Sequence, residues 1–251
     1  MSSASARVSQ VRPFYADYAD AYDLLVTDPV GPWVDAVDDR LLASGSSPAA
    51  VLDAGCGTGR HAAALAAKGH QVDLADASEQ LLAQAASRNP AALALHADLC
   101  ALAVSRRYQA VTCRGVLNDM ITDSDRDAVL HGLRSALYDG GVLMLDVREH
   151  EGSRRRADGL PRQRTADLGA RGVLEFASTV TWEAGLLHVT EDYRLRRPGL
   201  TADHRRFNFV MRPWRRREIR ERLTTVGFNN VDIGPGVGRT TGDRLFVFAR
   251  L

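Results

Sequence analysis

The sequence predicts an α/β fold with a mostly parallel β-sheet, and three observations carry this prediction. Residues 51–59 read VLDAGCGTG, which joins an apolar strand to a helix through three alternate glycines. A second apolar run, residues 71–76, ends in an acid as the first one does. Strand-like and helical stretches then alternate as far as Val147, which indicates right-handed crossovers between parallel strands. With 251 residues, 45% of them hydrophobic, the chain can fill one large α/β domain.

Two helices are expected ahead of the first strand. Residues 10–26 carry aromatic and aliphatic side chains at helical spacing, and a second helix is expected to start near Pro29 or Pro32 and to run to Ala43. Residues 44–48 read SGSSP and end this stretch as a loop. The polar first nine residues have no apolar core of a signal peptide and are expected to be a disordered start.

The chain changes character after the fifth expected strand. Residues 149–170 are polar and interrupted by glycine, so they are expected to form a loop. Three β-like runs follow, and the Ala-Gly pair at 184–185 predicts a hairpin between the first two; the runs are Val173–Glu183, Leu186–Leu195 and His204–Met211. They are expected to form an antiparallel insertion, too thin for a core of its own. The chain should close with a helix over 215–226 and an antiparallel pair at 229–233 and 245–249.

Composition narrows the function classes. The formal net charge of +1 gives no reason to expect a polyanionic partner, and no apolar run approaches the roughly 20 residues of a membrane span. The three cysteines lack paired spacing and are expected to be reduced, buried thiols of a cytoplasmic protein. No cluster of His, Cys, Asp or Glu has metal-ligand spacing, so no metal is expected.

Acids at the ends of the first three strands indicate a nucleoside site. Asp53 precedes the glycine turn, Asp76 ends the second strand, and Asp98 follows the third. A carboxylate at the end of the second strand can accept hydrogen bonds from a ribose diol, and the acid after the third can receive an adenine amino group. The G-x-G-x-G spacing differs from the dinucleotide fingerprint, and no phosphate-binding lysine follows it.

Taken in order, these motifs resemble those of class I S-adenosylmethionine-dependent methyltransferases. The resemblance rests on residues 51–78, on LHADL at 95–99, and on the expected fourth and fifth strands, 108–119 and 139–146. It implies a Rossmann-like, seven-stranded, mostly parallel sheet with helices on both faces and the antiparallel β insertion after the fifth strand. It also implies a single domain, 1–251, with an N-terminal helical lid over 10–45 and the insertion, 149–212, above the active site.

The resemblance implies S-adenosylmethionine as the cofactor. The residues expected to bind it are Asp53, Gly55, Cys56, Gly57, Gly59, Asp76, Ala77, Asp98, Leu99, Cys113 and Arg114. The glycines would lie against the methionine part, where a Cβ would otherwise obstruct the ligand.

The acceptor site is expected in the segments outside the cofactor motifs. Tyr22, Asn118 and Asp119 are candidate catalytic residues, because they lie in the lid and after the fourth strand. Candidate substrate-binding residues come from the lid, the fifth strand and the insertion: Tyr15, Tyr18, Arg148, Trp182, His188, Phe207 and Phe209. The tyrosines are three and four residues apart and share a face of the expected helix, where a core stripe is the alternative role. His188 and Glu191 fall on opposite faces of one strand, so at most one points into the site.

Three classes of function remain open on the sequence. The first is methylation of a small-molecule acceptor, on a nitrogen of a specialised metabolite or on carbon or oxygen of an aromatic, indole-type natural product. The second is methylation of nucleic acid or protein, but the loop after the fourth strand, CRGVLND, lacks the Asn/Asp-Pro-Pro-aromatic motif that stacks a flipped base. The third is cofactor binding without catalysis. We expect a small-molecule acceptor, no nucleic-acid or membrane partner, and a monomer or homodimer.

Overall fold

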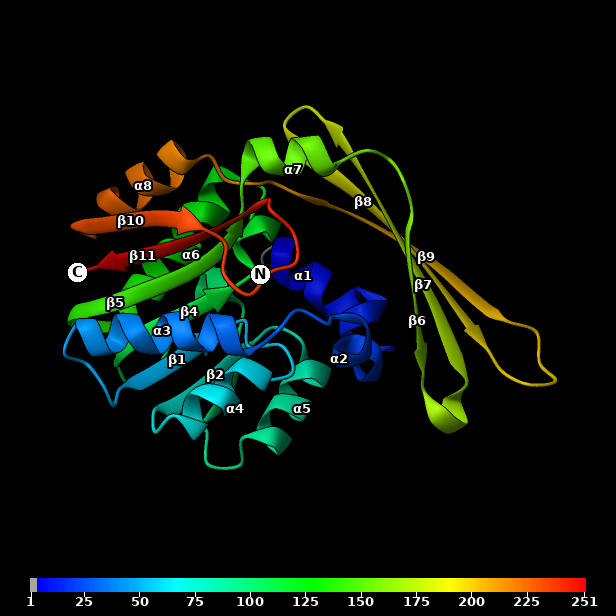
Figure 1. Cartoon of the computed structure of the whole chain (residues 1–251), viewed down its shortest axis with the longest axis horizontal. Coiled ribbons are helices and arrows are strands. Elements are labelled where there is room, and N and C mark those ends of the chain that lie inside the picture. The colour runs from blue at the N-terminus through cyan, green and yellow to red at the C-terminus, as the bar shows by residue number, and fades with distance from the viewer. Residues whose placement is uncertain (1–3) are drawn as a thin grey trace.

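The computed structural model describes residues 4–251 and shows two β-sheets joined by helices and by the N-terminal segment (Figure 1). Within these residues the larger sheet has seven strands in the order β10-β11-β5-β4-β1-β2-β3. Its strands are β1 (Ala50–Ala54), β2 (Gln71–Asp76), β3 (Ala94–His96), β4 (Tyr108–Arg114), β5 (Leu137–Arg148), β10 (Asn230–Pro235) and β11 (Arg244–Arg250).

The pairing of this sheet confirms the predicted fold class. Strands β1 to β5 pair in parallel, whereas β11 runs antiparallel to both β5 and β10. Side chains of α3, α4 and α5 pack on one face of the sheet, and those of α6 and α8 pack on the other. The carboxyl ends of β1, β2 and β4 therefore meet at one edge, which is where open α/β sheets bind ligands.

The helices between the strands of the larger sheet follow the expected order. Their bounds, with short 3₁₀ turns written η, are α1 (Ala4–Val11), η1 (Pro13–Tyr15), η2 (Ala19–Ala21), α2 (Tyr22–Leu25), α3 (Gly31–Ala43), α4 (Arg60–Ala67), α5 (Glu79–Arg88), η3 (Leu99–Ala101), η4 (Leu117–Asp119), α6 (Asp123–Ser135), α7 (His150–Arg156), η5 (Gly169–Arg171) and α8 (Arg216–Thr225). Among the residues that the structure describes, no helix is both long and apolar enough to cross a membrane.

The insertion forms a separate four-stranded antiparallel sheet (Figure 1). Its strands are β6 (Arg162–Asp167), β7 (Val173–Glu183), β8 (Leu186–Arg196) and β9 (Asp203–Met211). The predicted hairpin turns at Ala184 and Gly185, where φ is 49° and 85°. The expected loop over 149–170 instead contains α7 and β6. Strand β6 reads RQRTAD and buries only Ala166, so it carries no apolar alternation that a sequence pattern could reveal.

The N-terminal segment differs from the predicted single helix. Residues 10–26 form η1, η2 and the short helix α2, because the backbone leaves the helical conformation at Ala16 (φ −119°, ψ −97°) and again at Tyr18 (φ −117°, ψ 29°). The expected disordered start also holds a helix, α1; residues 1–3 of that start lie outside the described residues. Because the segment is broken, Tyr15, Tyr18 and Tyr22 do not share one helical face.

Packing explains why this segment adopts turns. Phe14, Tyr18 and Leu25 are buried against the inner face of the second sheet, where Tyr18 stacks on Tyr193 at 5.5 Å and Phe14 on Phe176 at 5.3 Å between ring centroids. A straight helix would turn part of this aromatic set away from the sheet. The segment thus lies between the two sheets, beside the carboxyl ends of the parallel strands (Figure 1).

Arg126 on α6 holds together the loops next to those strand ends. Its buried guanidinium lies 3.7 Å from the Trp214 ring centroid, donates to the carbonyl oxygen of Met120 at 3.0 Å, and pairs with Glu218 at 2.8 Å. It also donates to the carbonyl of Arg212. One side chain thereby fixes the end of η4, the chain after β9 and helix α8.

We expect Arg126→Ala to lower the free energy of unfolding by about 3 kcal/mol, because buried acceptors lose their donor and Glu218 loses its counter-charge. Arg220→Ala is the matched control: Arg220 is exposed on α8 and should change stability by less than about 0.5 kcal/mol. Urea unfolding of both variants measures the difference. Equal midpoints for the two variants would contradict the role given to Arg126.

Candidate functional site

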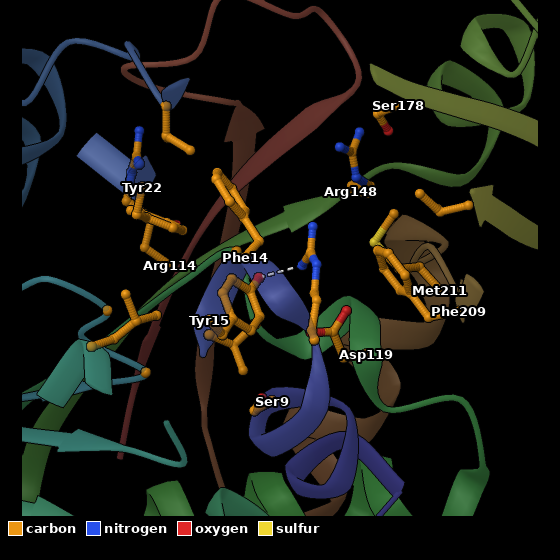
Figure 2. A pocket seen from close by; sticks show the side chains of 18 of the residues that line it. Ser9, Phe14, Tyr15, Tyr22, Arg114, Asp119, Arg148, Ser178, Phe209 and Met211 are labelled. Atoms are coloured by element: carbon orange, nitrogen blue, oxygen red, sulfur yellow. Dashed lines mark hydrogen bonds between the residues drawn. The ribbon is translucent and has the colours of Figure 1, made fainter. Parts of the chain in front are cut away.

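A cavity of about 330 Å³ lies where the carboxyl ends of the parallel strands face the N-terminal segment and the second sheet. Figure 2 shows Tyr15, Tyr22 and Arg114 on one side and Arg148, Phe209 and Met211 on the other. Twelve of the residues predicted from the sequence line it: Tyr15, Tyr22, Gly55, Gly57, Asp76, Ala77, Asp98, Leu99, Arg114, Asp119, Arg148 and Phe209.

The glycine turn is held against the end of β2. Backbone N–H groups of Gly55 and Cys56 donate to the Ala75 carbonyl oxygen at 2.7 and 3.1 Å, and Gly57 N donates to an Asp76 carboxylate oxygen at 2.8 Å. The other Asp76 oxygen accepts from Ser78 N at 2.9 Å. Burial raises the pKa of Asp76, while these backbone donors oppose the shift.

Space around the turn fits a ligand that approaches the backbone closely. A Cβ at Gly57 would meet no atom within 4 Å, and its φ of 55° is one that glycine adopts without strain. Asp76 and Asp98 line the same cavity, and Asp98 caps η3 by accepting from Cys100 N at 2.9 Å. The predicted nucleoside therefore has backbone and carboxylate groups at hand, and these residues fit S-adenosylmethionine.

Four predicted cofactor residues lie behind the cavity wall. Asp53 accepts a 2.8 Å hydrogen bond from Thr112 Oγ1, and burial raises its pKa to about 6. A Cβ at Gly59 would approach Ala85 of α5 to 2.8 Å, so this glycine permits close packing of two helices. Cys113 is fully buried in the main core. Asp53 and Cys56 border a smaller space of about 40 Å³, which adjoins the cavity because the two share Tyr22, Gly55, Gly57, Arg114 and Arg239.

The acceptor side of the cavity is aromatic and contains a buried ion pair. Arg12 pairs with Glu191 of β8 and donates to the Tyr15 hydroxyl at 2.6 Å, as the dashed line in Figure 2 marks. Its guanidinium lies 4.4 Å from the ring centroids of both Tyr15 and Phe209. Burial raises the pKa of the Tyr15 and Tyr22 hydroxyls, so both stay protonated at neutral pH.

Asp119 contributes a carboxylate to this side of the cavity (Figure 2). Burial raises its pKa to about 6, although Arg12 and Arg148 oppose the shift. Among residues 4–251, no side chain or backbone group is within hydrogen-bond distance of the Asp119 carboxylate. It is therefore available to a ligand.

Asn118, the other predicted catalytic residue of this loop, points away from the cavity. Its side-chain oxygen accepts from Arg148 N at 2.7 Å, and its amide donates to the Gly115 carbonyl oxygen at 3.1 Å. Both polar ends are used to join η4 to the end of β5. The structure thus gives Asn118 a positioning role beside Asp119.

Four predicted acceptor residues lie outside the cavity lining. Tyr18 is buried against Tyr193, and Trp182 packs edge-on against His150 with 4.9 Å between ring centroids. His188 is cross-strand neighbour to Thr181 and Val210, on the opposite face from Glu191, so the alternation of the strand turns it outward. The ring centroids of Phe207 and Phe209 are 6.0 Å apart, and Phe207 packs against the core between the N-terminal segment and the second sheet.

Several lining residues were missed by the prediction. Arg12, which was not predicted, meets Glu191 across 179 residues of sequence. Of His188 and Glu191, at most one of which was expected to point into the site, Glu191 lines the cavity. The other missed cations and acids of the lining are Asp28, Arg164, Arg239 and Arg244. Within residues 4–251 no group of three or more His, Cys, Asp or Glu is placed to hold a metal ion.

Comparison with known proteins supports the resemblance. Residues 51–141 match a family model described as a methyltransferase domain. A dTDP-3-amino-3,6-dideoxy-alpha-D-glucopyranose N,N-dimethyltransferase from Streptomyces fradiae is 29% identical over 150 residues. That match covers 58% of this chain and 59% of the relative, so it spans less than two thirds of the relative's length.

Solved structures show the same fold. The sugar N-methyltransferase KedS8 from Streptoalloteichus superposes with a TM-score of 0.79 at 18% identity, over 94% of this chain and 92% of that one. CalS10, an amino pentose methyltransferase from Micromonospora echinaspora, superposes with a TM-score of 0.72 at 22% identity, over 94% and 97%. At sequence identities this low, the similarity to these structures establishes the fold alone.

We expect Gly57→Ala to weaken S-adenosylmethionine binding about ten-fold, because the added methyl group enters the space against the turn. Isothermal titration calorimetry measures this affinity. The fold should persist, since no protein atom lies within 4 Å of the new Cβ.

Gly140→Ala is the matched control for this variant. Gly140 also has a positive φ, 76°, with no atom within 4 Å of an added Cβ, but it lies in β5 outside the cavity lining. Its affinity should equal that of the parent protein. If Gly57→Ala bound as tightly as Gly140→Ala, the cofactor would not lie against the glycine turn.

Proposed function

We propose that this chain, a member of the class I S-adenosylmethionine-dependent methyltransferases, transfers a methyl group to a nitrogen of a small-molecule acceptor. One observation carries the proposal: a single cavity joins the glycine turn, with Asp76 beside it, to the carboxylate of Asp119. Cofactor-binding groups and a group suited to an amine thus face the same space. The relatives named above, a sugar N,N-dimethyltransferase among them, support a nitrogen acceptor.

The proposed cofactor supplies a methyl group activated on a sulfonium. In our proposal Asp76 accepts hydrogen bonds from the ribose hydroxyls, and Asp98 and Leu99 contact the adenine. Gly55 and Gly57 leave the backbone open beside the methionine part. Of the other predicted contacts, Cys56, Gly59 and Cys113 are proposed to act through the shape of the turn and of β4 rather than by touching the ligand.

Asp119 is proposed to orient the acceptor nitrogen. An amine attacks only when it is neutral, and the ionised carboxylate can accept one N–H hydrogen bond while the lone pair points at the methyl carbon. When bound, S-adenosylmethionine would supply the methyl carbon to the nitrogen and leave as the neutral thioether, and Asp119 would accept the surplus proton of the methylated nitrogen and pass it to water. Holding the nucleophile in line is worth roughly 7–11 kcal/mol of barrier lowering in well-oriented systems.

Tyr15 and Tyr22 are proposed to cover the cavity as part of the N-terminal lid, 10–45. Their hydroxyls stay neutral, so they can donate to the acceptor without adding charge. Ser78 Oγ donates to the Tyr15 carbonyl oxygen at 2.6 Å, which ties this segment to the end of the strand that carries Asp76. Such a cover excludes water and strengthens the electrostatic interactions inside. We also propose that residues 1–251 form a single domain, to which this lid and the β insertion belong.

An aromatic acceptor, methylated on carbon or oxygen, is the second candidate. The side chains that favour it are Phe14 and Phe209, which give the cavity flat apolar walls. A planar ring fits between such walls, as does the apolar face of a sugar. Transfer to an indole in the absence of transfer to any amine would decide for this alternative.

A small molecule suits the site better than a nucleic acid. Three exposed arginines of the basic runs 205–206 and 215–217, which could otherwise meet phosphates, pair with acids instead: Arg205 with Asp17, Arg206 with Asp192, and Arg217 with Glu221. The loop after β4 is folded back by Asn118 and offers no stacking platform. For the oligomeric state, our prediction is a monomer or a homodimer.

Asp119→Asn should lower kcat about a hundred-fold and leave the affinity for S-adenosylmethionine unchanged, because the amide cannot accept the proton. The parent enzyme should lose kcat as the pH falls through about 6, since the raised pKa of Asp119 means that the carboxylate becomes protonated there. Transfer of a radiolabelled methyl group to a panel of amino sugars measures kcat and its pH dependence, and calorimetry measures the affinity for S-adenosylmethionine.

Asp139→Asn is the control for charge, since Asp139 is exposed at the opposite end of β5. This variant should keep the parent rate and the parent pH profile. An Asp119→Asn enzyme with the same acid limb as the parent would remove Asp119 from the proposed role. Absence of transfer to every amine tested, with the cofactor bound, would instead overturn nitrogen methylation itself.

A further inference from the structure

Glu191 is a buried acid to which the proposed transfer gives no role. It lies on β8, lines the cavity and is 2% exposed. Both carboxylate oxygens accept from Arg12, with 2.9 Å between Arg12 Nε and one of them, and the Tyr193 hydroxyl donates to that same oxygen at 2.5 Å. Within residues 4–251, these two side chains are the only hydrogen-bond partners of the carboxylate. A bidentate pair of this kind fixes the orientation of the guanidinium as well as its distance.

Arg12 is also held by aromatic groups of the cavity. Its guanidinium carbon lies 4.4 Å from the ring centroids of Tyr15 and Phe209, and Nη1 donates to the Tyr15 hydroxyl at 2.6 Å. Burial opposes the charged form of Arg12, but Glu191 and Tyr15 favour it, and its pKa is raised above the ordinary value. All three nitrogens of this permanent cation have acceptors, and Asp119 is not one of them.

Arginines from three elements act on the charge of Asp119. They come from the N-terminal segment, the end of β5 and the start of β11, and each has another acid as its partner; the pairs are Arg12–Glu191, Arg148–Asp243 and Arg244–Asp146. The other titratable groups that interact with Asp119 are Glu191 itself and the Tyr15 hydroxyl, which is neutral. The free carboxylate of the cavity therefore lies among cations whose charges are compensated by other acids.

The pair on β8 differs from the other two pairs. Asp243 also accepts from Ser153 Oγ at 3.1 Å, and Asp146 also pairs with Arg239, so both acids join segments of the cavity wall. Glu191 instead lines the same cavity as Asp119 and makes its ion pair with Arg12 alone. Its position is thus suited to controlling a single cation beside the proposed acceptor site.

We infer that Glu191 is a positioning residue for the proposed methyl transfer: it holds and neutralises Arg12, so that the guanidinium contacts Tyr15 instead of pairing with Asp119. The inference rests on the proposed function for the role of Asp119, and it adds the group that keeps this carboxylate free. A buried cation without a counter-charge is costly, so Arg12 without Glu191 would turn to the other carboxylate of the cavity. An ion-paired Asp119 is a weaker base and is no longer open to an amine.

Titration of Asp119 tests the inference without an acceptor. The full chain is labelled with carbon-13 at its aspartate carboxyl groups, and NMR follows each group with pH; the signal of Asp119 is the one missing from Asp119→Asn. In the parent protein it should titrate at about pH 6. In Glu191→Gln the titration should move about one pH unit lower, because an uncompensated positive charge favours the carboxylate. The acid limb of kcat should move with it, and kcat at neutral pH should fall about ten-fold.

Two further variants complete a charge cycle. Arg12→Gln leaves the negative charge of Glu191 uncompensated, so Asp119 should titrate at higher pH than in the parent protein. This variant gives a second measurement in the opposite direction should Glu191→Gln fail to fold. The double variant, Arg12→Gln with Glu191→Gln, removes both charges and should return the titration of Asp119 close to the parent pH.

Glu175→Gln is the matched control. Glu175 lies on the neighbouring strand β7 and pairs with Arg196 at 2.7 Å, but it lies outside the cavity lining. Its loss should leave both the titration and kcat unchanged. A shift in Glu191→Gln that the double variant reverses and Glu175→Gln lacks supports the inference. Titration of Asp119 at the parent pH in Glu191→Gln, or no upward shift in Arg12→Gln, overturns it. The amine assay is separate, because its failure would overturn nitrogen methylation while the titration still decides whether Glu191 keeps Arg12 from Asp119.

Discussion

The site depends on one packing constraint: the second sheet has an apolar inner face that its own four strands cannot cover. Leu174, Phe176, Tyr193 and Leu195 form this face. A single antiparallel layer is not stable with such a face in water, so it must pack on another element. The N-terminal segment supplies that element. It fills the space between the two sheets and leaves the cavity where it crosses the carboxyl ends of the parallel strands.

This arrangement explains why the cavity walls come from both ends of the chain. The buried pair of Arg12 and Glu191 links the segment to β8, and Arg239 in the turn before β11 pairs with Asp28 at 2.9 Å. Desolvating such charges is costly, and their value lies in fixing one geometry rather than in adding stability. The aromatic rings around Arg12 lower that cost by offering their negative faces to the cation.

The cofactor side could be predicted from the sequence because its signals are local. Gly55, Gly57 and Asp76 lie in strand–turn–helix units. The local geometry of such a unit places these residues at the carboxyl end of the strand, independently of contacts with distant segments. The placement of the proposed acceptor residues depends on tertiary packing, which position in the sequence does not reveal; Trp182 and His188 lie in the insertion but do not line the cavity. Tyr18 does not share a helical face with the other two tyrosines because the backbone leaves the helical conformation at Ala16 and at Tyr18 itself. Strand β6 was missed because an edge strand needs little apolar pattern.

Arginine makes the strand ends rigid enough to hold a reacting geometry. At the end of β5 the buried carboxylate of Asp146 pairs with Arg239 and accepts from Arg244 Nε at 2.6 Å. Burial lowers the pKa of Arg244 to about 9, which still leaves it charged at neutral pH, whereas a lysine desolvated there would lose its proton more readily. Asp146 is thus neutralised on both oxygens and cannot compete with Asp119 for an amine. The fold therefore separates two carboxylates at neighbouring strand ends, one that anchors the wall and one that faces the acceptor.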